Sequence, residues 1–492
     1  MGFLAHHFLD ETAERRADHT ALIAGGRGVS FAALARASSA AAGALAAAGV
    51  GRGDRVAVML DNSADYVIAL FAIWKAGAVY VPVNPTTKPD KLAFILQDCG
   101  VRMVFAPPAL ADACPVPVLT VADAVNGTPR ALEAAGVIDQ DLAAILYTSG
   151  TTGRPKGVML THANLCAVTR SIAQYLENTP DDVVLSVLPL TFGYGLSQVM
   201  TGALVGFTLV LERSFAFPAD TLKRMVEHRV TGFPGVPTVF STLLQMPAAK
   251  AADLSSLRYM TNAAAPLPSA HLARISEMFP QVRFFSMYGL TECSTRVCTL
   301  DPGQLPARIG SVGRPIPNCD AYVADAAGNR LPPGAVGELV VRGSNVMRGY
   351  WNLPEETARR LRPGPDGTPL LRTGDLFTAD AEGFLTFVAR MDDVFKCRGE
   401  KVSPKEIESV LCELDGVLEA AVIGVPDPVD GMAVKAIVVA RPDAVLSEAH
   451  VRQHCRARLE SHLVPRHVEF RADLPKTDSG KVRRAALAGG DG

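Results

Sequence analysis

The sequence predicts an α/β fold in which two stacked α/β lobes and a small β-barrel-like subdomain precede an α+β domain. Short apolar runs alternate with helical patterns from about residue 55 to residue 288, which is typical of parallel sheets with helices on both faces. Strand-like runs separated by Gly, Pro and Asn turns follow over about 305–390. A new set of helices and strands begins after Arg390. We therefore expect one domain over 1–390 and a second over 391–492, close to a common domain size.

The two lobes are predicted from apolar runs that have the length of buried strands. Helical periodicity separates these runs, most clearly over 63–77 and 218–229. In the subdomain we expect strands over 320–325, 337–343 and 383–389. The predicted strands of the lobes are 55–60, 79–83, 101–106, 142–147, 183–188, 207–211, 257–262 and 282–288.

The last domain is predicted to open with a helix. Ser403 and Glu406 have the spacing of a capping box, and Pro404 stands at the first helical position. Apolar residues then follow at helical spacing, so one face of the helix should pack. We also expect strands over 420–425 and 434–440 and a helix over 450–459.

The composition excludes several classes of function. The chain has 492 residues, of which 48% are hydrophobic and 20% charged, as in ordinary globular proteins. Its net charge of −2 argues against nucleic acid or an anionic membrane as a partner. Nine cysteines without a C-x-x-C pair indicate reduced thiols in the cytoplasm. No basic start precedes an apolar segment, and the alanine-rich run 40–50 is too short for a membrane span, so we expect no membrane insertion.

The segment 146–162, LYTSGTTGRPKGVMLTH, carries the strongest functional signal. Its hydroxyls can donate to phosphate oxygens, its glycines let backbone N–H groups approach an anion, and its lysine adds positive charge. A strand over 142–147 and a helix over 162–175 capped by Thr161 place the loop between a strand and a helix. The Gly-Lys-Ser/Thr of a Walker A loop is missing. The segment predicts a polyphosphate site made by Thr148, Ser149, Gly150, Thr151, Thr152, Gly153 and Lys156.

Six motifs together indicate a family, because they occur in that family's order. They are KAGAVYVPVNP from Lys75, the loop above, YGLTE from Tyr288, RTGDL from Arg372, RMDDVFKCRGEKVSPKEIE from Arg390, and PKTDSGK ending at Lys481. Through them nearly the whole chain resembles the adenylate-forming superfamily of acyl- and aryl-CoA synthetases, peptide-synthetase adenylation domains and beetle luciferases. The resemblance implies that a carboxylic acid attacks the α-phosphate of ATP, with Mg²⁺ present, and that pyrophosphate leaves.

The resemblance also implies the residues of the nucleotide site. Tyr288 would stack on adenine, Asp375 would accept hydrogen bonds from the ribose hydroxyls, and Arg390 would reach ribose or phosphate. Thr291 would contact phosphate and Glu292 would hold Mg²⁺, a hard cation that prefers oxygen ligands. The backbone of Ala264, Ala265 and Pro266 would lie against the adenine and acyl groups. Met287 and Gly289, the neighbours of Tyr288, would complete the nucleotide site.

The same resemblance implies a mobile C-terminal domain with two working positions. In the first, Lys481 would contact the acid carboxylate and the α-phosphate. The domain would then rotate about Asp392 and present the face that carries Lys396 and Gly399, as in a hinge motion.

The class of acid substrate is restricted by family motif residues that this sequence lacks. The family often has an aromatic residue followed by His after a Leu-Pro strand, but 188–195 contain no histidine. The Phe-Asp pair with which peptide-synthetase domains anchor an α-amino group is also absent, and an ammonium without a carboxylate partner is costly to bury. An amino acid is therefore disfavoured. We expect an apolar acyl or aryl pocket that includes Phe192, Tyr194, Phe233, Pro234, Gly235 and Met287.

The sequence thus predicts an ATP-dependent acid–thiol ligase that passes a fatty or aryl acyl group to coenzyme A. The alternative acceptor is the phosphopantetheine of a carrier protein acting in trans, since eleven residues follow Lys481. A non-catalytic nucleotide-binding protein is disfavoured because the charged motif residues are retained. A plain ATPase would not need the Lys481 segment.

Overall fold

A computed structural model describes residues 2–111, 114–126, 136–149, 155–265, 267–397, 400–427, 431–442, 444–477 and 482–488. The first lobe is built on a seven-stranded sheet in which β3, β4, β5, β6 and β7 pair in parallel. Two antiparallel strands, β8 and β18, extend it beyond β7. In order across the sheet the strands are β18 (Gly349–Tyr350), β8 (Pro155–Thr161), β7 (Leu142–Ser149), β4 (Val79–Pro82), β3 (Arg55–Val58), β5 (Val101–Phe105) and β6 (Val118–Leu119).

The second lobe and the β-rich subdomain share one continuous path of paired strands. Strands β1, β9, β10, β11, β12 and β13 are parallel, whereas the strands from β14 onward pair antiparallel. The order is β16 (Cys319–Ala324), β17 (Val336–Gly343), β20 (Pro369–Ala379), β21 (Leu385–Arg390), β15 (Ser311–Pro315), β14 (Cys298–Thr299), β13 (Arg283–Tyr288), β12 (Tyr259–Asn262), β11 (Gly232–Gly235), β9 (Val183–Ser186), β10 (Thr208–Leu211), β1 (Thr20–Ala24) and β2 (Arg27–Ser30), with β19 (Leu361–Pro363) beside β20.

Helices cover these sheets, and one helix is buried along most of its length. Every residue of α3 (Ala64–Lys75) from Tyr66 to Trp74 is buried, because the helix belongs to a core cluster that joins both lobes. Its first turn is capped by Ser63, whose Oγ accepts from the Tyr66 N–H. The other helices of the lobes are α1 (His7–Arg15), α2 (Phe31–Ala47), α4 (Pro89–Cys99), α5 (Val121–Asn126), α6 (His162–Tyr175), α7 (Gly193–Val205), α8 (Pro218–Glu227), α9 (Pro237–Leu243), α10 (Pro247–Ala251), α11 (Ser269–Met278) and α12 (Pro354–Arg360), with short 3₁₀ turns η1 (Pro108–Leu110), η2 (Thr291–Cys293) and η3 (Pro302–Ala307).

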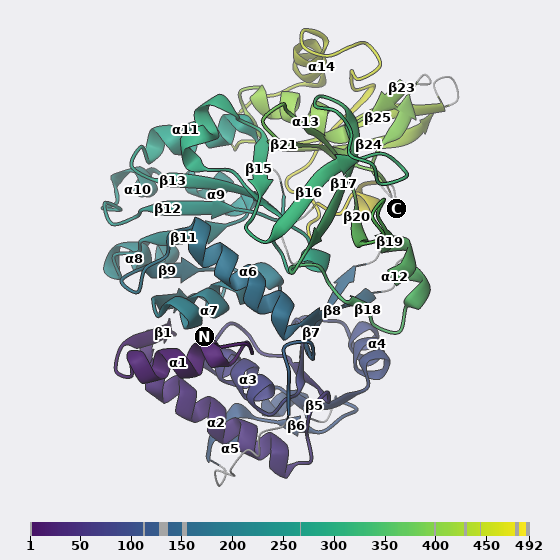
Figure 1. The fold of residues 1–492 in the computed structure, drawn as a ribbon. Helices are drawn as coiled ribbons and strands as arrows, with labels where there is room; N and C mark the ends of the chain where they lie inside the picture. Colours follow the sequence, from purple (N-terminus) through teal and green to yellow (C-terminus); the bar gives the residue numbers. More distant parts are fainter. Residues whose placement is uncertain are drawn as a thin grey trace.

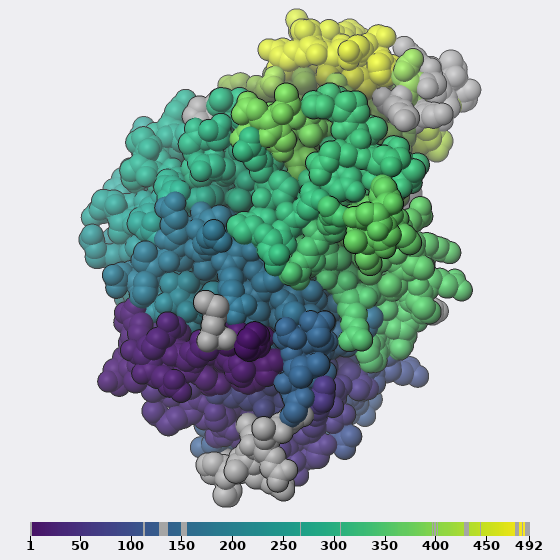
Figure 2. Space-filling model, in the orientation of Figure 1, coloured from purple at the N-terminus to yellow at the C-terminus, as the bar shows by residue number. Residues whose placement is uncertain are grey.

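The C-terminal part has a core of its own around a three-stranded sheet. It lies at the end of the molecule beside the β-rich subdomain (Figures 1 and 2). The sheet order is β24 (Val417–Asp427), β25 (Gly431–Ala440), β26 (His467–Phe470), with a separate hairpin of β22 (Phe395–Cys397) and β23 (Glu400–Val402). Its helices are α13 (Pro404–Glu413), α14 (Glu448–Arg456) and α15 (Ala485–Ala488). A separate core supports the predicted α+β unit.

The predicted fold class is confirmed, and the predicted strands and helices form near their expected positions. Strand β11 was not predicted, because its sequence GFPG contains two glycines and a proline, which normally argue against a central strand. The predicted capping box at Ser403 is wrong. Its Oγ donates to the Val388 carbonyl 2.9 Å away and makes no cap bond, because the start of α13 packs on β21.

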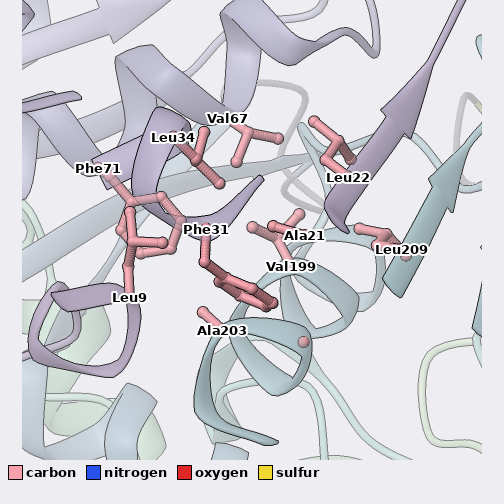
Figure 3. Close-up of a pocket in the computed structure, with 11 residues that line it drawn as sticks. Leu9, Ala21, Leu22, Phe31, Leu34, Val67, Phe71, Val199, Ala203 and Leu209 are labelled. Atoms are coloured by element: carbon pink, nitrogen blue, oxygen red, sulfur yellow. The ribbon is translucent and has the colours of Figure 1, made fainter. Parts of the chain in front are cut away.

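A small cavity of about 20 Å³ lies between α2, α3, α7, β1 and β10 (Figure 3). Only apolar side chains and glycine line it, among them Leu9, Phe31 and Phe71. Such a cavity offers no polar group to a charged ligand. It belongs to the packing of the N-terminal core. Within the described residues, no helix is long and apolar enough to cross a bilayer.

Candidate active site

The predicted phosphate loop connects two antiparallel strands. β7 pairs with β8, with Thr148 opposite Lys156, so the helix α6 begins a full strand after the loop. The expectation of a strand–loop–helix anion site is therefore wrong. The start of α6 is closed by a capping box in which Thr161 Oγ1 and the Asn164 side chain bond backbone N–H groups. In β8, Val158 and Leu160 are buried while Met159 between them is half-buried.

Part of the loop lies outside the described residues. This holds for Gly150, Thr151, Thr152 and Gly153 and for the side chain of Ser149. The two described ends are close to each other, since Thr148 and Lys156 are paired across the hairpin. Their assignment to phosphate binding stays a prediction.

Lys156 has an anionic partner that the sequence did not reveal. Its Nζ lies 2.7 Å from Glu356 Oε2 in α12 and 5.6 Å from the centre of the Tyr350 ring. The Lys156 side chain is only 14% exposed, so this ion pair is well shielded from water. The hydrogen bond from Lys156 holds the pKa of Glu356 below its usual range.

Tyr350 contacts both Glu292 and this lysine. The Tyr350 hydroxyl donates to Glu292 Oε1 at 2.7 Å, while the face of the same ring lies near Lys156 Nζ. Burial, followed by the neighbouring Glu292 carboxylate, raises the pKa of Tyr350 and keeps it a donor. Thr291 and Glu292 form the start of the η2 turn, where both are half-buried. Two motifs far apart in sequence thus meet through an aromatic residue for which neither motif gives a signal.

A second group joins Tyr288, Asp375 and Arg390. The Tyr288 hydroxyl donates to Asp375 Oδ2 at 2.6 Å, and Arg390 Nε lies 3.6 Å from Asp375 Oδ1. Asp375 and Arg390 stand opposite each other in the β20–β21 pairing. The Tyr288 ring packs edge-on against Phe377, and burial together with Asp375 raises its pKa. Three residues predicted to hold the nucleoside are therefore in direct contact, although their roles stay predictions.

Backbone geometry around this group is unusual at two predicted positions. A Cβ on Gly289 would lie 1.9 Å from the Thr295 carbonyl oxygen, so the chain returns tightly against the YGLTE motif. Ala264 has a left-handed φ of 73°, which is uncommon for a residue with a side chain. The Asn262 side chain supports the following turn by donating to the Ala265 carbonyl at 3.1 Å. Pro266 lies outside the described residues.

The predicted acyl-pocket residues divide into two groups. Tyr194 is buried at the start of α7, and its hydroxyl contacts Thr261 Oγ1 at 2.6 Å. Met287 Sδ lies 3.2 Å from the Tyr175 hydroxyl, and Phe192 is half-buried at the cap of α7.

Phe233 and Gly235 form the second group and stand in β11, where both are buried. Phe233 is fully buried in the hydrophobic core and packs against Phe215 and Phe240. A Cβ on Gly235 would lie 2.8 Å from the Phe240 ring. Both contacts are those of core packing. Their assignment to the acyl pocket stays a prediction.

The C-terminal candidates are only partly described. Lys481 and Gly399 lie outside the described residues, as does the side chain of Lys396 in β22. Asp392 is exposed immediately after β21. Its neighbour Asp393 accepts from Arg484 Nη1 at 2.9 Å, and Arg484 also binds Glu408 through both carboxylate oxygens. The C-terminal segment is thereby fastened next to the predicted hinge.

Comparison with known proteins identifies the family. The family model described as AMP-binding enzyme matches residues 9–351, and the model described as AMP-binding enzyme C-terminal domain matches residues 406–481. The chain belongs to the AMP-binding enzyme family. The matches agree with the adenylate-forming resemblance carried by the six motifs.

Relatives of this AMP-binding enzyme extend over nearly all of its length. A feruloyl-CoA synthase of Amycolatopsis sp is 36% identical over 476 residues, covering 95% of each chain. A long-chain-fatty-acid–CoA ligase of Bacillus subtilis (strain 168) is 33% identical and covers 97% of this chain and 93% of its own. The o-succinylbenzoate CoA synthetase of Bacillus subtilis, solved with the acyl-adenylate OSB-AMP, has a TM-score of 0.88 at 30% identity and covers 99% and 98%. The chain is thus an AMP-forming acyl- or aryl-CoA ligase, with ATP and CoA as its co-substrates.

Proposed function

We propose that adenylation takes place where the Tyr288–Asp375–Arg390 group and the Lys156–Tyr350–Glu292 group lie. The single observation that carries this proposal is the Tyr350 ring, which brings the phosphate-loop lysine and the acidic residue of YGLTE together. A polyphosphate with a bound cation needs a positive side chain and a carboxylate side by side. The first group would hold the nucleoside and the second its phosphates.

Lys156 has to exchange partners for this chemistry. In the ligand-free protein its charge is satisfied by Glu356 at 2.7 Å. Phosphate oxygens that enter the loop would compete for the same ammonium, and Lys156 would then stabilise the negative charge that develops as pyrophosphate leaves. Glu356 would hold the lysine in position until ATP arrives.

Asp375 and Tyr288 would position the sugar. A carboxylate only accepts hydrogen bonds, which suits two ribose hydroxyls. Tyr288 donates to Asp375 in the free protein and holds it at the end of β20. Arg390 lies near the other oxygen of the same carboxylate.

The donor chemistry also fits Mg²⁺ as the metal. Mg²⁺ usually takes one or two protein carboxylates and completes its shell with waters and substrate phosphates. Among the described residues no cluster of three or more acidic, His or Cys side chains forms a dedicated metal cage, whereas Glu292 and the phosphate-loop lysine contact the same tyrosine, Tyr350. Glu292 would therefore hold the ion, and the ion would offset phosphate charge when bound.

We infer that the C-terminal part, 391–492, supplies Lys481 for adenylation and then turns about Asp392 for thioester formation. The exposed position of Asp392 between β21 and the Arg484-bound Asp393 supports a hinge there. The packing of α13 on β21, through Ser403 and Lys405, would be remade in that turn. The cytoplasm is the proposed location of this CoA ligase, in agreement with nine free cysteines.

The test is acid-dependent exchange of labelled pyrophosphate into ATP, measured over a panel of aliphatic and aromatic acids. We expect exchange with at least one class of acid and a CoA thioester by mass spectrometry when CoA is added. Lys481→Ala should lose exchange yet convert a supplied acyl-adenylate to thioester. Absence of exchange across the panel would refute the proposed site, and equal loss of both half-reactions would refute the two-position assignment.

A further inference from the structure

Arg296 is a buried cation without a carboxylate partner in the described part of the chain. Its side chain belongs to a residue that is 1% exposed, and no ion pair of the described residues includes it. Nε donates to the Tyr175 hydroxyl at 3.2 Å and Nη1 to the Thr295 carbonyl at 2.9 Å. The guanidinium also lies 4.4 Å from the centre of the Tyr194 ring. None of the described hydrogen bonds uses Nη2.

These neutral neighbours are an incomplete environment for an arginine. A guanidinium has five N–H donors and stays protonated in proteins, so burial cannot be relieved by loss of the proton. An uncompensated buried charge is costly, and proteins normally pair such a group with an anion. An anion that arrives with the substrate would complete this environment.

Arg296 lies among the residues expected to contact the acid. Tyr194 covers one face of the guanidinium and also contacts Thr261 at the carboxyl end of β12. Tyr175, which accepts from Arg296, contacts Met287 at the end of β13. Ligands of open parallel sheets bind beyond the carboxyl ends of the strands.

The chain geometry brings Arg296 back towards the site after YGLTE. Ser294 and Thr295 both have left-handed φ values, 49° and 78°, which reverse the chain after Glu292. Asn345 fixes this turn, since its Nδ2 donates to the Arg296 carbonyl at 2.7 Å. These two left-handed conformations are strained, and the reversal that they make places the guanidinium inside the protein.

We propose that Arg296 is a specificity-determining residue that binds a second carboxylate on the acid substrate. The enzyme activates a dicarboxylic acid at one end: one carboxylate attacks the α-phosphorus and displaces pyrophosphate, while the other stays ionised on the guanidinium. With one face covered by Tyr194, the edge of the guanidinium offers the paired N–H groups that match a carboxylate. This inference rests on the proposed adenylation function and deepens it by naming the class of acid.

The test compares dicarboxylic acids with their monomethyl esters, which have the same length but one charge fewer. In wild-type protein we expect kcat/KM for pyrophosphate exchange to be about 100-fold higher with the best diacid than with its monoester. Arg296→Met should lose about 100-fold with the diacid and remain within a few fold with the monoester. Arg296→Lys should recover part of the diacid activity, because lysine restores charge without the paired donors.

Arg283→Met is the matched control. Arg283 also lies over an aromatic ring, that of Phe285 at 5.3 Å, but its side chain is 38% exposed and paired with Glu177. We expect this variant to leave the ratio of diacid to monoester activity unchanged. Equal use of diacid and monoester by wild type, or an equal loss of both activities in Arg296→Met, would overturn the proposal.

Thermal unfolding separates this proposal from the proposed function. The best-stabilising diacid should raise the Tm of wild-type protein without ATP and leave that of Arg296→Met unchanged. If no acid supports exchange but this shift is seen, the adenylation site is refuted and the anion site stands. If exchange occurs while diacids shift both proteins equally or neither, Arg296 is not the anion site.

Discussion

Arg296 and Arg372 are both buried arginines, yet their surroundings differ. Arg372 lies 3.1 Å from Glu338 Oε2 and donates to the carbonyls of Asp325 and Ala326. Glu338 is in turn fixed by the Gly374 N–H at 2.9 Å. Arg296 has only hydroxyl, carbonyl and aromatic partners among the described residues. The first environment includes a carboxylate that the protein supplies, and the second has none among the described residues.

The difference separates a structural charge from a functional one. Arg372 begins the RTGDL motif, and its bonds hold the strand β20 that carries Asp375. It positions a site residue without needing a ligand itself. An arginine whose partners are all neutral is buried at a cost in free energy, and a bound anionic ligand would offset that cost.

The largest expected effect is the loss of stability when Arg372 is replaced. Arg372→Met leaves Glu338 buried without its cation and should lower the free energy of unfolding by about 3–5 kcal/mol. Arg296→Met removes a charge that has no carboxylate partner, and the loss of its stacking on Tyr194 offsets part of the gain, so we expect a change below about 1 kcal/mol. Urea unfolding of both variants without ligands measures the contrast. If both variants lose a similar amount of unfolding free energy, Arg296 stabilises the fold as much as Arg372 does.

The next effect concerns Lys156, a cation whose protein partner is expected to be temporary. Lys156→Met should reduce kcat for adenylation by about 10²–10³, the usual result of removing one donor that stabilises a developing charge. Glu356→Gln removes only the resting partner and should change kcat by a few fold. Single-turnover adenylation with saturating ATP makes the comparison. If Glu356→Gln lowers kcat as much as Lys156→Met does, the ion pair is needed throughout the reaction. The hypothesis that Lys156 leaves Glu356 to bind phosphate would then be wrong.

The sequence predicted the parts of the site better than their connections. Tyr288, Asp375 and Arg390 were identified from motifs, and the structure brings them into contact. Tyr350 and Glu356 were missed, because the contacts that give them importance join segments about 60 to 200 residues apart. Arg296 was missed for a different reason: sequence shows a charge but cannot show that its surroundings lack an opposite one. Strand β8 was also missed, although its sequence PKGVMLT includes the short apolar run Val158, Met159 and Leu160.

A smaller effect is expected at Tyr288, whose hydroxyl bonds a charged acceptor. Tyr288→Phe should lower the free energy of unfolding by about 1.5–3 kcal/mol without ATP. Saturating ATP should recover part of this loss, because ribose hydroxyls would replace the phenol as donors to Asp375. Tyr259→Phe is the control, since the Tyr259 hydroxyl accepts a hydrogen bond from Asn178 in the core at 2.8 Å. The fall in the free energy of unfolding that this variant causes should not depend on ATP. A deficit in Tyr288→Phe that ATP leaves unchanged would argue against Asp375 as the ribose ligand.

The smallest effect tests a third buried cation, Lys405, which differs from both arginines because it can lose its proton. Its Nζ donates to the Phe387 carbonyl at 2.9 Å, and burial lowers its pKa to about 8, although nearby Glu408 opposes the shift. Between pH 8 and about 10.4 the unfolded chain then binds more protons at this residue than the folded protein does, so its contribution to stability rises with pH. The difference in unfolding free energy between wild type and Lys405→Met should accordingly move in favour of wild type over that interval. A difference that is independent of pH would show that Lys405 keeps its proton, as an arginine would, and that the α13–β21 contact holds a full charge.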